Sequence, residues 1–234
     1  MSTARLSRQV VYGRNGMVCT NSPLSAAAGL KVLQEGGNAF DAALAVAATE
    51  TVTMVPMCGI GGDSFILLYE AANGHVTGMS SAGVPGSGTS ADYYRKQGLT
   101  KMPLEGPHSV GVPGEVAAWE EVHRRFCSKR FDQLLDTAVG YAEDGFALPP
   151  KIAQSFTSTH KRLAAYPSTA EVLLAGGRTP VEGDLLVNRD LAESLRRIGK
   201  GGAEEFYKGD LSRKMVKALN NAGGLFTNED FANH

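Results

Sequence analysis

Few residues of this chain stand in a pattern that suggests chemistry, and those that do are small and polar. Ser80 and Ser81 end a predicted strand, and the residues alone indicate a serine pair that closes it. A glycine-rich turn, GIGG at residues 59–62, precedes another strand and is followed by Asp63. Because a dinucleotide-binding fingerprint follows a strand and opens a helix, we interpret this turn as a packing turn and not a phosphate site.

The remaining titratable residues show no catalytic or metal-binding spacing. Asp41 falls in the first turn of a predicted helix, where a carboxylate suits the positive end of the helix dipole. We therefore expect a capping or buried structural role for Asp41, and no cofactor or metal in this chain. The histidines lack HxxxH or HExxH spacing and are predicted to be surface or structural residues. They are His75, His108, His123, His160 and His234.

The cysteines and the charge balance exclude several classes of protein. Three widely spaced cysteines support neither a disulfide framework nor a CxxC metal site, so Cys19, Cys58 and Cys127 are expected to be isolated buried thiols. A net charge of −1 lacks the basic surplus of nucleic-acid-binding proteins. The start of the chain is basic without an apolar segment behind it, and later apolar runs are too short to cross a membrane. We expect a soluble, cytoplasmic protein with neither nucleic acid nor membrane as partner.

The first third of the chain alternates predicted strands and helices around these residues. A strand is predicted at 16–21, and Ser22 and Pro23 then open a helix that runs to Glu35. Asn38 caps a second helix, whose alanine-rich interior is apolar on nearly every face and predicts burial on more than one side. The apolar run at 65–69 predicts a strand covered on both faces.

The rest of the chain is predicted to be mainly helical. An Asn73-Gly74 turn joins the strand at 65–69 to a second strand at 76–79, as in a hairpin. Later helices are predicted at 115–126, at 131–144, from Pro150 onward, at 189–198 and at 211–221. This order of elements favours a helix-backed sheet with an added helical lobe.

Five sequence blocks, in one order, resemble the γ-glutamyltranspeptidase family of N-terminal-nucleophile hydrolases. The blocks are GGNAFDAALA at 36–45, the segment from Pro56 through GIGG to Phe65, SVGVPG at 109–114, AEDGF at 142–146 and GGLFTNEDF at 223–231. Their order over almost the whole chain makes the resemblance far more specific than one glycine-rich loop would.

The resemblance implies an α/β (α+β) fold, the four-layer αββα sandwich with a helical lobe, whose sheet is completed by a second chain or segment. Residues 1–234 then resemble the large-subunit part of one domain, with sheet and buried helices at about 1–112 and a mainly helical lobe at about 113–234. The family is made as a precursor that cuts itself into a heterodimer. A new N-terminal Thr on the small subunit attacks an amide, its own amino group serving as base. No catalytic residue is therefore expected in this chain, and a dimer of heterodimers is compatible with the resemblance.

One departure from the family pattern concerns the substrate. Typical members carry an Arg after the hairpin that binds the glutamyl α-carboxylate, and Ser81 stands at that position here. A hydroxyl lacks the planar fork with which Arg holds a carboxylate. The chain is thus similar to the branch that includes oxamate amidohydrolases, with Ser80 and Ser81 as substrate-binding residues and a small amide acid as substrate. The alternatives are γ-glutamyl transfer or hydrolysis, and a truncated, non-catalytic binding or structural protein. Asp63 is expected to be an exposed turn carboxylate, or to orient a catalytic group across the subunit boundary.

Overall fold

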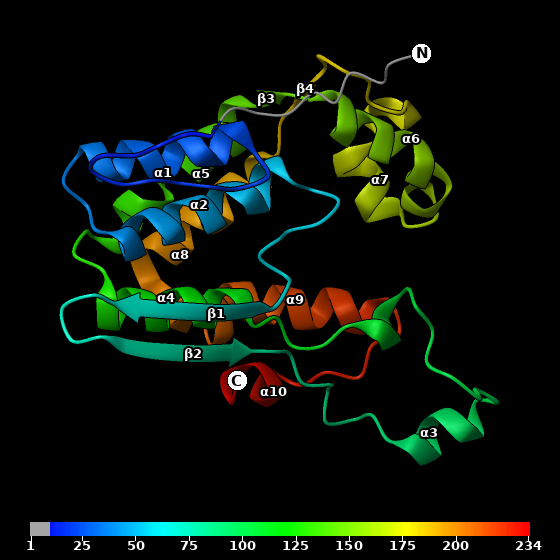
Figure 1. Cartoon of the computed structure of the whole chain (residues 1–234). Coiled ribbons are helices and arrows are strands. Elements are labelled where there is room, and N and C mark those ends of the chain that lie inside the picture. The colour runs from blue at the N-terminus through cyan, green and yellow to red at the C-terminus, as the bar shows by residue number, and fades with distance from the viewer. Residues whose placement is uncertain (1–9) are drawn as a thin grey trace, which may run out of the picture.

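The computed structural model describes residues 10–234 and places a packed group of helices beside a projecting β-hairpin (Figure 1). The basic start at residues 1–9, on which the expected location partly rests, lies outside the described residues. The helices are α1 (Pro23–Gln34), α2 (Ala39–Thr53), α3 (Ala91–Lys96), α4 (Glu115–Phe126), α5 (Phe131–Asp144), α6 (Pro150–Ala164), α7 (Pro167–Leu173), α8 (Arg189–Tyr207), α9 (Asp210–Asn221) and α10 (Asn228–Ala232). The strands are β1 (Ser64–Glu70), β2 (His75–Ser81), β3 (Phe146–Ala147) and β4 (Leu185–Leu186), and short 3-10 turns lie at Pro107–Ser109 and Ala175–Gly177.

Local capping signals fix the first two helices, as the sequence predicts. Ser22 caps α1, with its hydroxyl oxygen accepting from Ser25 N and Pro23 in the first turn. Asn38 and Asp41 form a reciprocal capping box at the start of α2. The small residues of α2 let α1, α4 and α5 pack against it, so its predicted burial on more than one side is confirmed.

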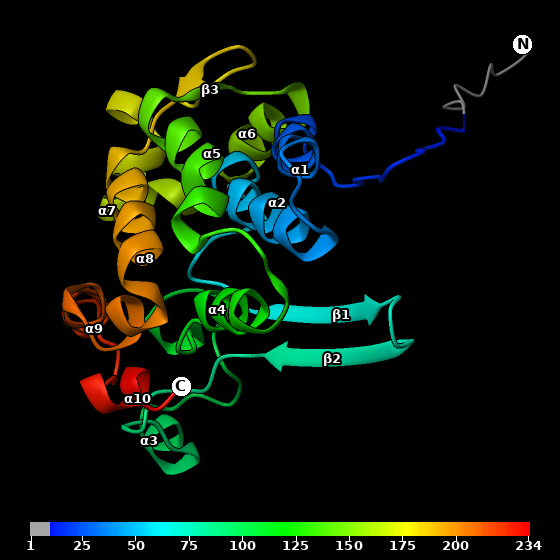
Figure 2. The same cartoon turned by 90° about the vertical axis from the view of Figure 1, so that its left-hand side faces the viewer.

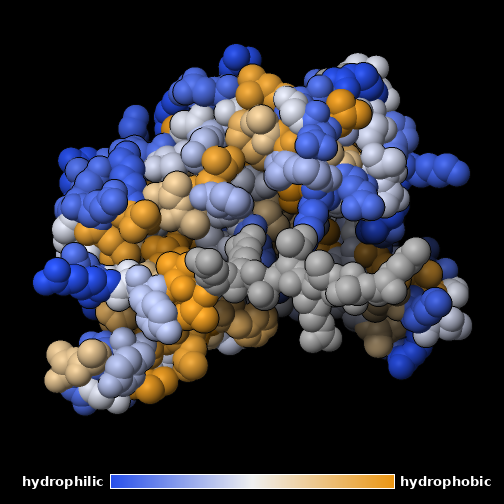
Figure 3. All heavy atoms as spheres, turned by 45° about the horizontal axis from the view of Figure 1, so that its top comes forward, coloured by the Kyte–Doolittle hydropathy of each residue, from blue (hydrophilic) through white to orange (hydrophobic). Residues whose placement is uncertain are grey.

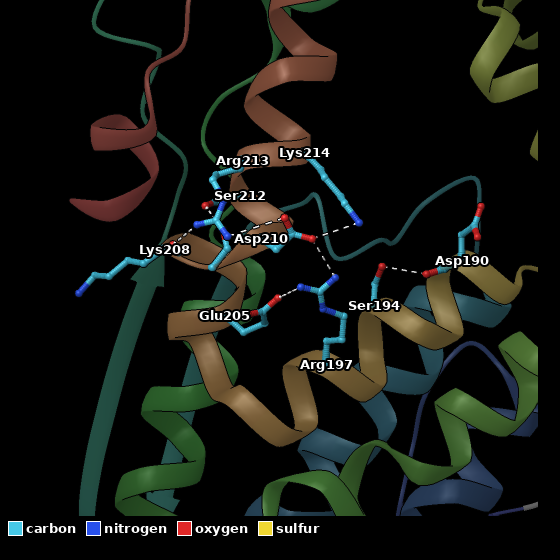
Figure 4. A network of polar contacts seen from close by, with 10 residues as sticks. Asp190, Ser194, Arg197, Glu205, Lys208, Asp210, Ser212, Arg213 and Lys214 are labelled. Atoms are coloured by element: carbon cyan, nitrogen blue, oxygen red, sulfur yellow. Dashed lines mark hydrogen bonds and ion pairs between the residues drawn. The ribbon is translucent and has the colours of Figure 1, made fainter.

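The centre of the core is the contact between α5 and α8, with α2 packed on α5. The helix predicted at 189–198 continues to Tyr207 and bends at Gly202, whose φ is 67°. Arg197, which precedes the bend, contacts Glu205 beyond it and, at 3.2 Å, Asp210 at the start of α9 (Figure 4). No helix within residues 10–234 is long and apolar enough to cross a membrane.

Within residues 10–234, one face of the hairpin is covered by other elements and the opposite face is open. Strands β1 and β2 pair antiparallel, and the second strand contacts α4. On the opposite face Phe65, Leu67 and Tyr69 are 76%, 78% and 62% exposed. The prediction that this strand is covered on both faces is therefore wrong for the part of the chain that the structure describes, because no second layer lies there. Figure 2 shows the hairpin projecting away from the helices.

The strand predicted at 16–21 is also absent. The described residues form only the pairs β1–β2 and β3–β4, and the segment at 16–21 joins neither. A strand needs hydrogen bonds from a neighbour, and no other described strand runs beside this segment.

Apolar surface gathers at the lower left of the face drawn in Figure 3, the side on which Figure 1 places the hairpin turn.

Candidate functional site

The start of β1, the end of β2 and the N-terminus of α4 meet at one place, which we call the Ser81 junction. Ser64 pairs with Ser81 across the hairpin. The Ser81 hydroxyl donates to Gly114 O at 2.8 Å. The carbonyl of Gly62 accepts from the N–H groups of Gly114 and Glu115, both at 2.9 Å. The GIGG turn thus supports the junction, as its interpretation as a packing turn predicted.

Gly114 is required at this junction by the close approach of the two backbones. A Cβ at position 114 would lie 1.7 Å from Ser81 O and 2.6 Å from Ser81 C. No side chain fits in that gap, so β2 and α4 can meet here only through a glycine. The Ser81 hydroxyl is already a donor to Gly114 O, which leaves its lone pairs free to accept from a bound molecule.

The structure does not bring Ser80 and Ser81 to the same face. Successive strand residues point to opposite faces, and Ser81 is half-buried on the α4 side, whereas Ser80 is exposed beside Phe65. Ser80 instead lines an open groove of about 460 Å³ on the outer face of the hairpin, together with Phe65, Ile66, Leu67, Gly78 and Met79.

Asp63 holds the segment that follows β2. Its Oδ1 accepts from Gly83 N at 2.8 Å, and the residue is exposed, in line with the simpler of its two predicted roles. Gly83 is itself packed closely, because a Cβ there would lie 2.4 Å from Val112 O. Gly114 therefore fixes the backbone at Ser81, and Asp63 fixes it two residues further on.

Glu115, which the sequence did not single out, is the titratable residue most tightly built into the junction. One carboxylate oxygen accepts from Trp119 Nε1 at 2.6 Å, and the other accepts from the Ser64 hydroxyl. Burial raises the pKa of Glu115 and outweighs these two hydrogen bonds, and the nearby carboxylates of Asp63 and Glu50 add to the rise. Its only sequence signal is an acidic residue in the first turn of a helix, which is common and carries no indication of function.

Asp41 has the structural role that the sequence predicts. It is fully buried, and its carboxylate accepts from Asn38 N, from the backbone and hydroxyl of Ser128, and from Lys129 N. Burial alone would raise the pKa of Asp41, but hydrogen bonds from Ser128, Lys129 and Asn38 prevail and lower it. The carboxylate is therefore ionised and fully occupied, which does not suit a general base.

The thiols differ from their prediction. Cys19 and Cys58 are exposed, so the expectation of buried thiols is wrong for both. Each lies in a segment outside the helices and strands. Cys127 is half-buried, and burial together with the Asp41 carboxylate raises its pKa to about 12. Residues 10–234 contain no cluster of three or more histidine, cysteine or acidic side chains that could hold a metal ion.

The histidines occupy surface and structural positions, as predicted for those whose contacts are described. His75 is exposed at the hairpin turn. A ring nitrogen of His123 lies 2.9 Å from Lys129 O, and His160 Nδ1 lies 2.8 Å from the Thr179 hydroxyl. The ring of His108 packs against Tyr94, with ring centres 5.4 Å apart.

Comparison with known proteins gives one consistent result. The family model described as Gamma-glutamyltranspeptidase matches residues 25–234. A curated relative, the glutathione hydrolase-like YwrD proenzyme of Bacillus subtilis, is 35% identical over 96% of this chain and 42% of its own length. The crystal structure of γ-glutamyltranspeptidase from Helicobacter pylori is similar at 32% identity and a TM-score of 0.91, covering 96% of this chain and 65% of that one. Cephalosporin acylase from Bacillus halodurans is similar at 33% identity and a TM-score of 0.92, covering 97% of this chain and 44% of that one.

The matches extend along nearly all of this chain but only part of each relative. This chain spans about two fifths of the length of the curated relatives it matches, several of which are named proenzymes. The described residues thus correspond to one part of a longer protein in those relatives.

Proposed function

Because the chain belongs to the gamma-glutamyltranspeptidase family, we propose that it is the large-subunit-like, non-nucleophile part of an autoprocessed amidohydrolase. Residues 1–234 then form part of one domain, with the sheet-bearing part at about 1–112 and the mainly helical part at about 113–234. A partner segment supplies the remaining strands of the four-layer sandwich and the N-terminal Thr. In this proposal the protein acts in the cytoplasm.

The exposed face of the hairpin is the observation that carries this proposal. An isolated two-stranded hairpin is at best marginally stable in water. Strands β1 and β2 nevertheless project from the helices (Figure 2), and three of their large apolar side chains are exposed. No third strand within residues 10–234 pairs with β1 or β2, so their outer edges are open to further strands. A partner sheet packed on Phe65, Leu67 and Tyr69 removes this surface from water, whereas a chain that acts alone leaves it exposed.

The proposed reaction takes place between the two parts. The Thr hydroxyl of the partner attacks the amide carbon while its own α-amino group accepts the proton, and the amine leaves after taking up a proton. Water then attacks the acyl-enzyme and releases the acid, or an amine takes the acyl group in a transfer reaction. The partner provides the donors that stabilise the oxyanion. The contribution of this chain is to bind and orient the acyl group near the Ser81 junction.

We favour a small amide acid such as oxamate as substrate, because Ser81 stands where an Arg would hold the glutamyl carboxylate. Ser80 and Ser81 remain the proposed substrate-binding residues, and their placement on opposite faces favours Ser81 as the residue that acts from the junction. The similar proteins include a glutathione hydrolase-like proenzyme and a cephalosporin acylase, so γ-glutamyl amides are the alternative to be tested beside it.

Two measurements test the proposal. Intact-mass analysis of the native protein is expected to show a second polypeptide that begins with Thr. A lone, stable, monomeric chain would overturn the proposal of a two-part enzyme and favour a non-catalytic binding protein.

The processed protein is then assayed with oxamate-type amides and with γ-glutamyl anilides, before and after Ser81→Arg. We expect oxamate-type turnover before the change and a gain of γ-glutamyl turnover after it. Strong γ-glutamyl turnover by the unmodified protein contradicts the substrate assignment.

A further inference from the structure

Tyr207, the last residue of α8, reaches the turn that supports Ser81. Its hydroxyl donates to Pro113 O at 2.6 Å and accepts from Ala117 N at 3.1 Å. The side chain is 5% exposed, and its ring packs edge-on against Phe206, with ring centres 5.0 Å apart. The hydroxyl thus makes two hydrogen bonds inside the protein, and both go to the N-terminal end of α4.

These bonds replace a missing helix cap. Gly114 precedes α4 and has no side chain to accept from the first turn. The N–H groups at the start of a helix lack partners within the helix and need them from elsewhere. Gly62 O satisfies two of them and Tyr207 satisfies that of Ala117, so α8 and the GIGG turn together hold this helix end.

The same helix end holds Ser81. Pro113, which accepts from Tyr207, is bonded directly to Gly114, whose carbonyl accepts from the Ser81 hydroxyl. Gly114 also lies so close to the Ser81 backbone that no side chain fits between the two. We propose that Tyr207 is a positioning residue that sets the place of Ser81, and so the binding of the acyl group, through the Pro113-Gly114 turn.

The chemistry of Tyr207 suits a permanent role of this kind. Burial raises the pKa of its phenol well above the usual value, and the carboxylates of Glu115, Asp63 and Glu120 add to the rise. The phenol therefore keeps its proton at neutral pH and remains a donor to Pro113 O. The consequence for substrate binding rests on the proposed function, whereas the consequence for the backbone does not.

A double-mutant cycle on the processed enzyme tests the catalytic consequence. With the amide that the enzyme turns over, we expect Tyr207→Phe to raise KM about fivefold to tenfold and to leave kcat within about twofold. In a Ser81→Ala background, Tyr207→Phe is expected to add less than twofold, because its effect passes through Ser81. Tyr141→Phe, on α5, and Phe206→Leu, which weakens the same helix end but keeps the hydroxyl, are the controls and are expected to leave KM unchanged.

Additive effects of Tyr207→Phe and Ser81→Ala, or an equal rise in KM with Phe206→Leu, would assign Tyr207 a purely structural role and overturn the inference.

Amide hydrogen exchange gives a test that needs no activity. In the unmodified protein the Ala117 amide is expected to exchange as slowly as the helix interior, and Tyr207→Phe is expected to speed exchange at Ala117 and at residues 81–84. Rapid exchange of Ala117 in the unmodified protein overturns the inference even if the variant does not fold. Absence of any amide turnover overturns the proposed function instead and leaves the exchange result to decide the role of Tyr207.

Discussion

The carboxylate of Asp41 ties the start of α2 to the loop between α4 and α5. It accepts four hydrogen bonds, one from Asn38, two from Ser128 and one from Lys129. An amide in its place offers one acceptor oxygen and turns two N–H groups toward the same donors. We expect Asp41→Asn to lower the free energy of unfolding by about 3 kcal/mol, measured by urea denaturation at pH 7. Asp136→Asn, at an exposed position on α5, is the control and is expected to have little effect.

The same substitution has a defined pH dependence. Because the folded-state pKa of Asp41 lies below its usual value of 3.8, its contribution to stability is present above that value and is lost as the pH falls through the lower folded pKa. The difference in unfolding free energy between the native protein and Asp41→Asn is therefore expected to stay constant from pH 7 to pH 5 and to shrink in more acidic solution. A difference that does not change down to the acid unfolding limit contradicts this account.

Glu115 is predicted to behave in the opposite sense. Its folded-state pKa is raised above the usual 4.5, so its contribution to stability is present below that value and is lost as the pH rises through the folded pKa. Glu115→Gln keeps the neutral form at every pH. We expect this variant to have a higher Tm than the native protein at pH 7 and nearly the same Tm at pH 4, as measured by differential scanning calorimetry. Glu171→Gln, exposed on α7, is the control, and a lower Tm for Glu115→Gln at pH 7 would show that the ionised carboxylate stabilises the junction.

At the scale of elements, Gly114 and Gly140 differ in whether their surroundings leave room for a side chain. A Cβ at Gly114 would overlap Ser81 O, whereas a Cβ at Gly140, inside α5, meets nothing within 4 Å. We expect Gly114→Ala to lower the free energy of unfolding by about 3 kcal/mol, because β2 must move away from α4. Gly140→Ala is expected to raise it by about 0.5–1 kcal/mol, since alanine suits a helix interior better than glycine. Equal stability of the two variants in urea would show that β2 and α4 do not approach as closely as described.

Elements that start from local signals were predictable from the sequence. The side chains of Ser22 and Asn38 satisfy the first N–H groups of their own helices, so nearby residues suffice to place both starts. The expected end of α8 at Ile198 was wrong because the glycines that follow it suggest a stop. In the structure Gly199 lies so close to α5 that a Cβ would be 3.1 Å from Asp132 Cα, so this glycine serves helix packing.

Whether residues 16–21 form a strand depends on a neighbouring strand that no local pattern reveals. The Ser81 junction likewise depends on residues that are distant in the sequence. The sequence predicts a strand at 76–79 that Ser80 and Ser81 close, but the partners of Ser81 come from far along the chain. Gly114 lies 33 residues away, and Tyr207 acts on Pro113 across 94 residues. Neither Tyr207 nor Glu115 carries a local signal that distinguishes it from an ordinary helical residue.

At the scale of the whole molecule, the described residues form a helical core with one apolar sheet face left open. The core combines an early helix with later ones, because α2 packs against α5 and α5 packs against α8. Among the described helices, α4 makes the main contact with the hairpin, whose other face carries Phe65, Leu67 and Tyr69. The stability of the core and the exposure of the hairpin are therefore separable, and surface changes on β1 test association without unfolding the helices.

The double variant Phe65→Lys with Leu67→Lys tests whether the open face of β1 binds a partner sheet. Burying a Phe or Leu side chain contributes about 1.5–3 kcal/mol, so loss of both is expected to weaken association with a partner sheet by about a thousandfold. In the two-part enzyme of the proposed function, we expect the two parts to separate on size-exclusion chromatography when this variant is introduced, while circular dichroism shows the helices of this chain unchanged. Leu104→Lys, at a position that is 95% exposed outside the hairpin, is the control and is expected to leave the assembly intact. An assembly that survives the double variant places the partner elsewhere on the molecule and leaves the open face of β1 without a role in joining the two parts.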